Sequence, residues 1–312
     1  MKIVGIAGLN KDKFNFLKKK NSSIKLLNIN DDNFFKNKNI NAIMIFGEWA
    51  VKKNLSIFLN TEYNFFKKLE WVHLSRAGID EFINILPNYK FKFTCGKTIQ
   101  GPNVSEHCMA LLLNLTRGMY DYDKKKFRPT EIYKKDILIT GLGGIGVSVA
   151  EKLNAFGANV STAESGLKPC YSFVKNYYDI SDLKNIVGQF DIVINTTPLT
   201  KKTFNLFNKK IFKNMKQGVF FVNVSRGDIV NTDDLKKYVK KNKFSGVGLD
   251  IIGSEDFVKK NPFKKFKNVI FTNHLAGITT DNLRRFDLLE KNLKNYINNE
   301  YLINIVDPKR QY

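Results

Sequence analysis

The sequence predicts an α/β protein with two parallel sheets, and three observations support this prediction. Short apolar runs alternate with amphipathic segments along the first hundred residues, and a second alternation of the same kind begins at Asp136. Strands that alternate with helices join into parallel sheets. The length of 312 residues is more than one small core normally organises, so we expect two domains.

Four apolar runs bounded by Gly, Asn or Pro are expected to be strands of the first domain. They are Lys2–Ile6, Ala42–Phe46, Trp71–Ser75 and Phe91–Thr94. The amphipathic segments Asp12–Lys20 and Ser56–Leu69 are typical of helices between strands. A longer helix is expected from Asn103, because Asn103 or Ser105 offers an N-cap after Pro102 and ahead of a long apolar stripe.

The second alternation predicts a doubly wound sheet of its own. Its expected strands are residues 136–140, 158–163, 191–197, 218–225, 244–250 and 268–273. A helix is expected over Gly146–Phe156, between the first two of these strands. Apolar residues recur at helical spacing over Thr279–Asn299, which predicts a last helix that must pack on one of the two domains.

The charge of the chain raises nucleic-acid binding as an alternative, since 51 basic and 29 acidic residues give a net charge of +22. The basic residues are nearly all lysines, and they are spread along the whole chain. Neither zinc-finger spacing nor an aromatic RNA-binding motif accompanies them. We therefore expect a solvated lysine surface and no specific nucleic-acid partner.

Other compositional features exclude several classes of protein. No run approaches the about 18 apolar residues of a membrane-spanning helix, and the first residues lack the layout of a secretory signal, so we expect a soluble, cytoplasmic protein. The three scattered cysteines exclude a disulfide scaffold and a cysteine zinc site. Only three histidines are present, so we expect no metal centre.

A glycine-rich turn follows the strand 136–140. The segment Gly141-Leu142-Gly143-Gly144-Ile145-Gly146 matches G-x-G-x-x-G between a strand and a helix. Gly141 permits a tight turn, Gly143 lets the backbone approach a pyrophosphate, and Gly146 lets the helix lie close to the strand. The helix start presents free N–H groups and a positive dipole end to the anion. The pattern predicts a Rossmann dinucleotide-binding domain.

A second marker of dinucleotide binding is Glu164, which ends the next strand 23 residues after Gly141. An acid at this place accepts hydrogen bonds from the adenine-ribose hydroxyls and repels a 2′-phosphate, so it favours NAD over NADP. Two alternatives stay open: Glu164 is only a charge at a strand end, or nearby Lys168 assists NADP.

Three later segments each place a functional side chain just past a predicted strand. Arg226, Asp250 and His274 follow successive strands, and Glu255 comes five residues after Asp250. Because the carboxyl ends of parallel strands meet at one edge of a sheet, we expect these side chains to converge. Taken singly, three of these residues have plainer interpretations: Arg226 as a bridge to a helix end, Glu255 as a solvated acid in a loop, and His274 as a core histidine.

Segments along most of the chain resemble the D-isomer-specific 2-hydroxyacid dehydrogenase family, which includes glyoxylate and hydroxypyruvate reductases, D-lactate dehydrogenases and phosphoglycerate dehydrogenases. In chain order they are RAGID at 76–80, NVSEH at 103–107, GLGGIG at 141–146, TTPLTKKT at 196–203, NVSRGDIV at 223–230, the Asp250 and Glu255 pair, and NHLAG at 273–277.

The resemblance implies an NAD-binding Rossmann domain at 103–278 and a flavodoxin-like substrate domain formed by 1–102 and 279–312. It also implies a homodimer. The implied reaction is reversible hydride transfer between NAD(H), with NADP as an alternative, and a small D-2-hydroxy acid or 2-oxo acid of the glyoxylate or hydroxypyruvate type, in a cleft between the domains. A second implied function is that of an NAD(H)-responsive regulatory protein with the same fold.

The resemblance also implies residue roles. Arg226 would bind the substrate, His274 would be the acid/base, Glu255 its partner, and Asp250 would order the nicotinamide end of the cofactor. Thr197 and Pro198 would contact the adenosine, and Val224 and Ser225 the nicotinamide side. Ala77 and Gly78 would contact the substrate carboxylate. Arg76 either contacts the side chain of the substrate or points to solvent.

These residue types suit the reaction, because reducing a 2-oxo acid builds negative charge on the carbonyl oxygen. An arginine stays charged and donates two parallel hydrogen bonds, and a carboxylate beside a histidine raises its pKa. Two departures from the family pattern bear on loop shape: Asp256 replaces the usual proline after the glutamate, and Asn273 replaces the usual proline before the histidine. We expect His73 to be structural, and His107 either structural or facing the cleft.

Overall fold

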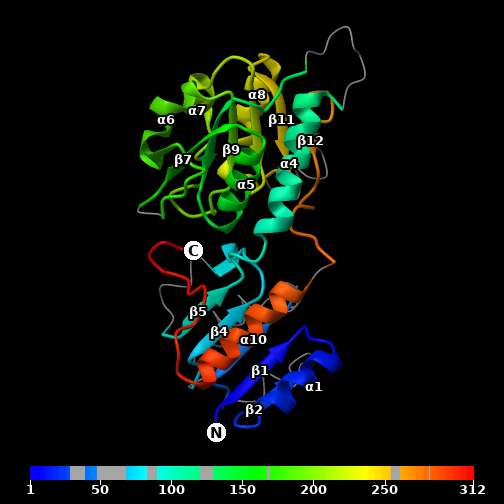
Figure 1. Cartoon of the computed structure of the whole chain (residues 1–312), viewed down its shortest axis with the longest axis vertical. Helices are drawn as coiled ribbons and strands as arrows, with labels where there is room; N and C mark the ends of the chain where they lie inside the picture. The colour runs from blue at the N-terminus through cyan, green and yellow to red at the C-terminus, as the bar shows by residue number, and fades with distance from the viewer. Residues whose placement is uncertain are drawn as a thin grey trace. The chain divides into compact units, whose positions relative to one another are not determined.

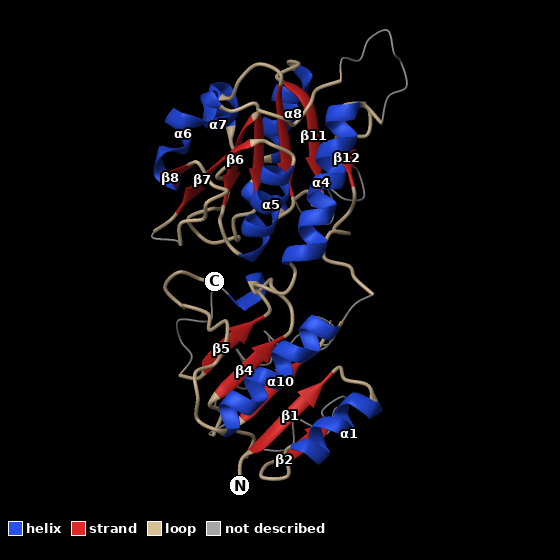
Figure 2. Cartoon of the chain, viewed as in Figure 1, coloured by secondary structure: helices blue, strands red, loops and turns tan. Residues whose placement is uncertain are grey.

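The computed structural model describes residues 1–28, 39–47, 68–82, 90–119, 129–166, 169–253, 261–280 and 282–312. These residues form two compact units, Met1–Ile99 with Thr280–Tyr312, and Gln100–Thr279. Each unit has its own parallel sheet, as Figures 1 and 2 show. The predicted α/β class with two parallel sheets is confirmed.

The first unit contains, among the described residues, five strands in the order β2-β1-β3-β4-β5, which is the flavodoxin-like order. They are β1 Ile3–Ala7, β2 Lys25–Asn28, β3 Ala42–Ile45, β4 Trp71–Leu74 and β5 Lys92–Cys95. Strand β2 was not predicted from the sequence; it is a short edge strand in which only Leu26 is buried. Most of the predicted helix Ser56–Leu69 lies outside the described residues.

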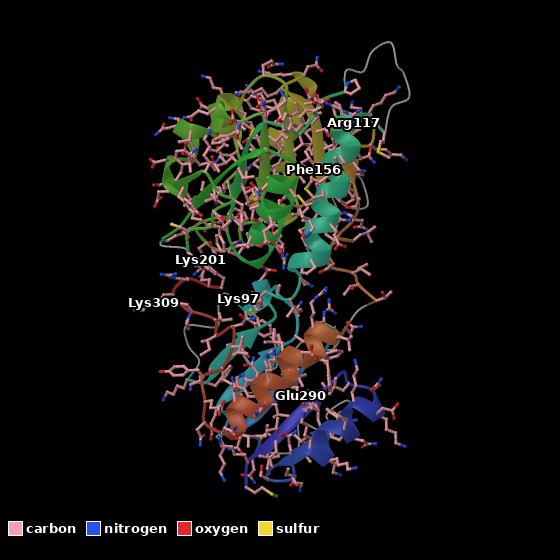
Figure 3. All side chains as sticks on the ribbon, in the orientation of Figure 1. Lys97, Arg117, Phe156, Lys201, Glu290 and Lys309 are labelled. Carbon is pink, nitrogen blue, oxygen red and sulfur yellow. The ribbon has the colours of Figure 1, made fainter. Side chains whose placement is uncertain are left out.

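Two helices from opposite ends of the chain, α1 (Lys11–Lys20) and α10 (Leu283–Ile297), lie on one face of this sheet (Figure 1). Their apolar residues pack in one core cluster with those of β1, β3 and β4. The rings of Tyr296 and Trp71 lie 5.0 Å apart. Glu290 on α10, labelled in Figure 3, forms an ion pair with Lys20 at the end of α1. The C-terminal helix therefore completes the core of the first unit.

The second unit contains seven described strands in the order β12-β11-β10-β9-β6-β7-β8. They are β6 Asp136–Thr140, β7 Asn159–Glu164, β8 Asn176–Asp179, β9 Ile192–Asn195, β10 Val219–Asn223, β11 Phe244–Leu249 and β12 Val269–Phe271. From β6 the chain adds strands first on one side and then, from β9, on the other. This reversal is the Rossmann switch point, beside which ligands bind at the carboxyl ends of the strands.

Helices cover both faces of the larger sheet (Figure 2). One layer contains α4 (Gly101–Arg117) and α5 (Gly144–Ala155), and the other contains α6 (Leu183–Ile186), α7 (Lys209–Asn214) and α8 (Thr232–Lys240). Short 3-10 helices lie at Asp80–Phe82, Ile180–Asp182, Val187–Gln189 and Gly227–Ile229. Successive strand residues face opposite layers: Ile192 and Ile194 pack with α4 and α5, whereas Val193 packs with the other layer. Within the described ranges, no helix combines the length and apolar character needed to cross a membrane.

Helix α4 begins two residues earlier than predicted. Its N-cap is Gln100, so the prediction of Asn103 or Ser105 as the cap is wrong. Pro102 belongs to the first turn, where its missing N–H costs nothing. Two glycines without side chains let the helix lie close on β11. A Cβ at Gly248 would come within 3.2 Å of Leu111 Cβ, and a Cβ at Gly246 would come within 2.9 Å of Leu115 Cδ2.

His73 lies within β4 and is fully buried, as expected of a structural histidine. Its Nδ1 lies 2.8 Å from the Thr94 hydroxyl, which also accepts a hydrogen bond of 2.9 Å from the Trp71 indole. Burial lowers the pKa of His73 from 6.5 to about 3. The neutral imidazole is therefore the form that this core holds.

We expect His73→Asn to reduce the acid sensitivity of folding. As the pH falls below 6.5 the unfolded chain binds a proton at His73, whereas the folded chain does not until about pH 3, so stability is lost on acidification. The loss between pH 7 and pH 5 should be smaller in the variant by about 2 kcal/mol, measured by urea unfolding. An equal loss of stability in the variant and the wild type over this pH range would contradict the role of His73.

Candidate functional site

The glycine-rich turn links β6 to α5 at the switch point of the larger sheet. Gly141 has a φ of 93°, and a Cβ there would lie 2.7 Å from Thr197 N. At Gly146 a Cβ would lie 2.0 Å from Gly141 O, so this glycine lets the helix pack against the turn. Gly144 and Ile145 form the first turn of α5 after the N-cap Gly143.

Gly143 differs from its neighbours because a Cβ there would meet nothing within 4 Å. The residue is exposed, and its φ of −82° is open to any amino acid. The backbone of the turn and the N–H groups at the start of α5 therefore face open space at the positive end of a helix. This place fits the phosphates of a dinucleotide.

A row of buried polar side chains, which the sequence analysis missed, joins the ends of β6, β9 and β10. Asn195 Oδ1 accepts a hydrogen bond of 3.1 Å from the Thr140 hydroxyl, and Asn195 Nδ2 donates one of 2.9 Å to Asn223 Oδ1. Asn223 Nδ2 donates in turn to the carbonyl oxygen of Arg226 at 3.1 Å. All three side chains belong to residues with no exposed surface. The sequence signal for them is an amide that ends each of the apolar runs IVIN and VFFVN.

The same amides hold the loops that carry the predicted cofactor contacts. Asn195 Oδ1 also accepts from the backbone N–H and the hydroxyl of Thr197, at 3.1 and 2.6 Å. Asn223 Oδ1 accepts from the Ser225 N–H at 3.2 Å, and the Ser225 hydroxyl donates to Thr197 O. Thr197, Val224 and Ser225 are buried, whereas Pro198 is exposed. Glu164 lies half-buried at the end of β7, on the opposite side of β6 from Asn195.

Arg226 follows β10, at the start of the 3-10 helix Gly227–Ile229. Its Nη1 donates a hydrogen bond of 2.9 Å to Ser225 O. Beside it, a Cβ at Gly227 would lie 2.2 Å from Gly253 N, so Gly227 lets the loop after β10 touch the loop after β11. Arg226 is therefore half-buried, in a loop that packs next to the segment after Asp250.

Asp250 directly follows β11 and is 1% exposed. Its Oδ1 accepts hydrogen bonds from the Thr272 hydroxyl at 2.7 Å and the Leu275 N–H at 2.8 Å, and the Ala276 N–H lies 3.2 Å from both oxygens. Burial raises the pKa of the carboxyl, but the nearby His107 side chain and hydrogen bonds from Thr272 and the Ala276 N–H outweigh it and hold the pKa below its usual value. The charged carboxylate therefore anchors the loop 272–276, which follows β12.

His274 lies in this loop with its side chain exposed, and its backbone N–H donates to Asp250 O. Asn273 and His274 have φ values of 51° and 62°, in the left-handed region. Asparagine enters this region more readily than most residues, and proline cannot enter it. The replacement of the usual proline by Asn273 thus matches the backbone of this loop.

The structure brings together some of the predicted site residues. Arg226, Asp250 and His274 follow the adjacent strands β10, β11 and β12. Glu255 and Lys168 lie outside the described residues. Arg76, Ala77 and Gly78 follow β4 in the first unit. Among the residues that the structure describes, no group of three or more His, Cys, Asp or Glu side chains is placed to hold a metal ion.

Comparison with protein families and relatives places this site in context. The model of the family described as "D-isomer specific 2-hydroxyacid dehydrogenase, NAD binding domain" matches residues 106–276. The glyoxylate reductase of Thermofilum pendens is 30% identical in an alignment of 204 residues that covers 61% of this chain and 60% of that protein. The glyoxylate/hydroxypyruvate reductase A of Citrobacter koseri is 25% identical over 260 residues, covering 79% of this chain and 83% of that protein.

Solved structures match over the whole chain. A probable 2-hydroxyacid dehydrogenase from Rhizobium etli, in complex with NADP, aligns with a TM-score of 0.81 at 20% identity and covers 100% of this chain and 99% of that chain. An NADPH-dependent glyoxylate/hydroxypyruvate reductase from Sinorhizobium meliloti aligns with a TM-score of 0.80 at 20% identity, with 100% of both chains covered. At these identities the likeness shows that the fold is shared.

The glycine turn yields a test of the local packing. Gly146→Ala should destabilise the protein by about 1–3 kcal/mol, because the new methyl group would overlap Gly141 O. Gly143→Ala is the matched control: its methyl group meets open space, and it should cost less than about 1 kcal/mol as a change of N-cap residue. Urea unfolding of both variants measures the difference, and equal losses would contradict the assigned packing.

Proposed function

Because the chain belongs to the D-isomer specific 2-hydroxyacid dehydrogenase family, we propose that it transfers hydride reversibly between NAD(H) and a small D-2-hydroxy acid or 2-oxo acid of the glyoxylate or hydroxypyruvate type. The observation that carries this proposal is the arrangement of Arg226 after β10 and His274 after β12, the two strands that flank β11, at the carboxyl edge of the sheet that also holds the open glycine turn.

The proposed roles follow from the chemistry of each group. The nicotinamide supplies a carbon that donates or accepts hydride. The planar guanidinium of Arg226 binds the substrate carboxylate and stabilises negative charge on the carbonyl oxygen during reduction. The exposed imidazole of His274 donates the proton to that oxygen, with Glu255 as its partner. Ala77 and Gly78 of the first unit offer backbone N–H groups to the carboxylate, and Arg76 contacts the rest of the acid.

The cofactor contacts are part of the same proposal. The glycine turn 141–146 would hold the pyrophosphate, Thr197 and Pro198 the adenosine, and Val224 and Ser225 the nicotinamide side. Glu164 supports NAD, since a carboxylate at the end of β7 would repel a 2′-phosphate. The structural neighbours from R. etli and S. meliloti were solved with NADP, so both cofactors need to be assayed. A homodimer acting in the cytoplasm, where NAD(H) is available, completes the proposal.

Turnover tests the assignment directly. The protein should oxidise NADH with glyoxylate, hydroxypyruvate or pyruvate, measured by the loss of absorbance of the reduced cofactor. Arg226→Ala and His274→Gln should each lower kcat/KM by about 100-fold or more, because each removes a charge or proton that the transition state needs. NADH affinity, measured by fluorescence, should stay within about twofold, since neither side chain is proposed to hold the cofactor.

Arg117→Ala is the matched control for the arginine. It removes an exposed guanidinium at the end of α4, labelled in Figure 3, and should leave turnover unchanged. NADH binding without turnover across a broad panel of 2-oxo acids would overturn the enzyme assignment and favour an NAD(H)-responsive regulatory protein.

The open turn predicts a separate effect on cofactor affinity. In Gly143→Ala the methyl group would occupy the space that the pyrophosphate needs, so the Kd for NADH should rise by about tenfold or more. Isothermal titration calorimetry measures this change. An unchanged Kd in the folded variant would show that the cofactor phosphates lie elsewhere.

A further inference from the structure

The first two turns of α4 contact the loop that carries His274. The side chains of Asn103 and His107, four residues apart on one face of the helix, begin and end the NVSEH segment. Asn103 Nδ2 donates a hydrogen bond of 3.0 Å to Ala276 O. His107 Nε2 lies 2.8 Å from the Thr272 hydroxyl and 3.4 Å from Asp250 Oδ1. The helix therefore touches the loop on both sides of His274.

The hydrogen-bond donors of this cluster can be assigned from its chemistry. A carboxylate only accepts hydrogen bonds, so the single hydroxyl proton of Thr272 is donated to Asp250 Oδ1 over 2.7 Å. Thr272 must then accept from His107, whose Nε2 carries a proton. The imidazole thus donates into a chain that runs from His107 through Thr272 to Asp250.

The cluster is held on rigid elements. Leu111, one turn after His107 on α4, packs against Gly248 of β11, two residues before Asp250. Asp250 in turn binds the N–H groups of Leu275 and Ala276. The loop is therefore fixed at residue 272, at the His274 N–H, which donates to Asp250 O, and again at residues 275 and 276. Asn273 and His274, with their positive φ values, form the short exposed arch between residues 272 and 275.

We propose that His107 is a positioning residue for His274: through Thr272 and Asp250 it fixes the arch from which the imidazole of His274 reaches the substrate. The inference rests on the proposed function for the role of His274, but the fixing of the loop is a property of the protein alone. A left-handed backbone at two successive residues costs energy and persists only where its surroundings hold it. His107 supplies part of that hold.

The first experiment separates positioning from general packing. His107→Leu removes the donor and should lower kcat by about 10- to 100-fold, the effect of moving a reacting group by about 1 Å. NADH affinity and thermal stability should change little. His107→Gln keeps an N–H donor at a similar reach and should restore most of kcat, a rescue that a purely steric role would not show. Glu106→Gln alters the exposed neighbour on α4 and should match the wild type.

A second variant tests the proposed route through Thr272. Thr272→Val keeps the shape of the side chain and removes the hydroxyl, so it should lower kcat to a similar degree. If both residues act through one chain of hydrogen bonds, the kcat of the double variant should lie within about twofold of the kcat of the less active single variant. Multiplicative losses in the double variant would overturn the coupling. Thr272→Val also carries the test should His107→Leu fail to fold.

Amide hydrogen exchange provides a readout that does not depend on turnover. In the protein without added cofactor, the Leu275 and Ala276 amides should exchange about fivefold faster in His107→Leu and Thr272→Val, while β10 and β11 keep their protection. Faster exchange in a protein without dehydrogenase activity would refute the proposed function and leave the positioning intact. Unchanged exchange together with unchanged kcat in an active enzyme would refute the positioning role.

Discussion

The carboxyl edge of the larger sheet depends on a row of hydrogen bonds among side chains that water does not reach. Thr140, Asn195 and Asn223 end three adjacent strands and have no exposed surface. A buried amide without partners is costly, so each of these groups must find donors and acceptors nearby. They find them in one another and in the backbone of the loops that follow. The row thereby fixes where the Thr197 loop and the Arg226 loop leave the sheet.

Asp250 performs the corresponding task one strand further along. Its carboxylate is buried, charged and surrounded by donors from the loop 272–276. These donors explain why the pKa of Asp250 lies below its usual value although burial raises it. The groups assigned to chemistry, Arg226 and His274, are by contrast half-buried and exposed. The edge therefore separates two kinds of polar residue: buried ones that set the shape of the loops, and accessible ones that are proposed to bind the ligand.

Much of this architecture could be predicted from the sequence, because the relevant signals are local. The strand-turn-helix around Gly141 and the apolar runs before Arg226 and Asp250 are contiguous, and the larger sheet has these elements in the predicted order. The edge strands β2 and β8 were missed because few of their residues are buried. The cap of α4 was misplaced because Asn103 uses its side chain on Ala276, far along the chain.

The site residues show the same limit. Asn195 and Asn223 look like ordinary strand ends in the sequence, and only the pairing of their strands makes them partners. His107 and Thr272 are 165 positions apart, and no spacing rule connects them. Asn273 could be recognised as a departure from the family pattern, but its left-handed backbone could not, since a residue type permits several conformations.

The first unit is built from both ends of the chain, and this has a consequence for biosynthesis. Ribosomes deliver residues in order, so the whole Rossmann unit emerges before α10 does. Until then Trp71, Val4 and Ile6 lack the leucines and the tyrosine of α10 that cover them. The nascent sheet of the first unit thus carries a partly uncovered apolar face until α10 emerges, and transiently exposed apolar surface of this kind is prone to aggregation.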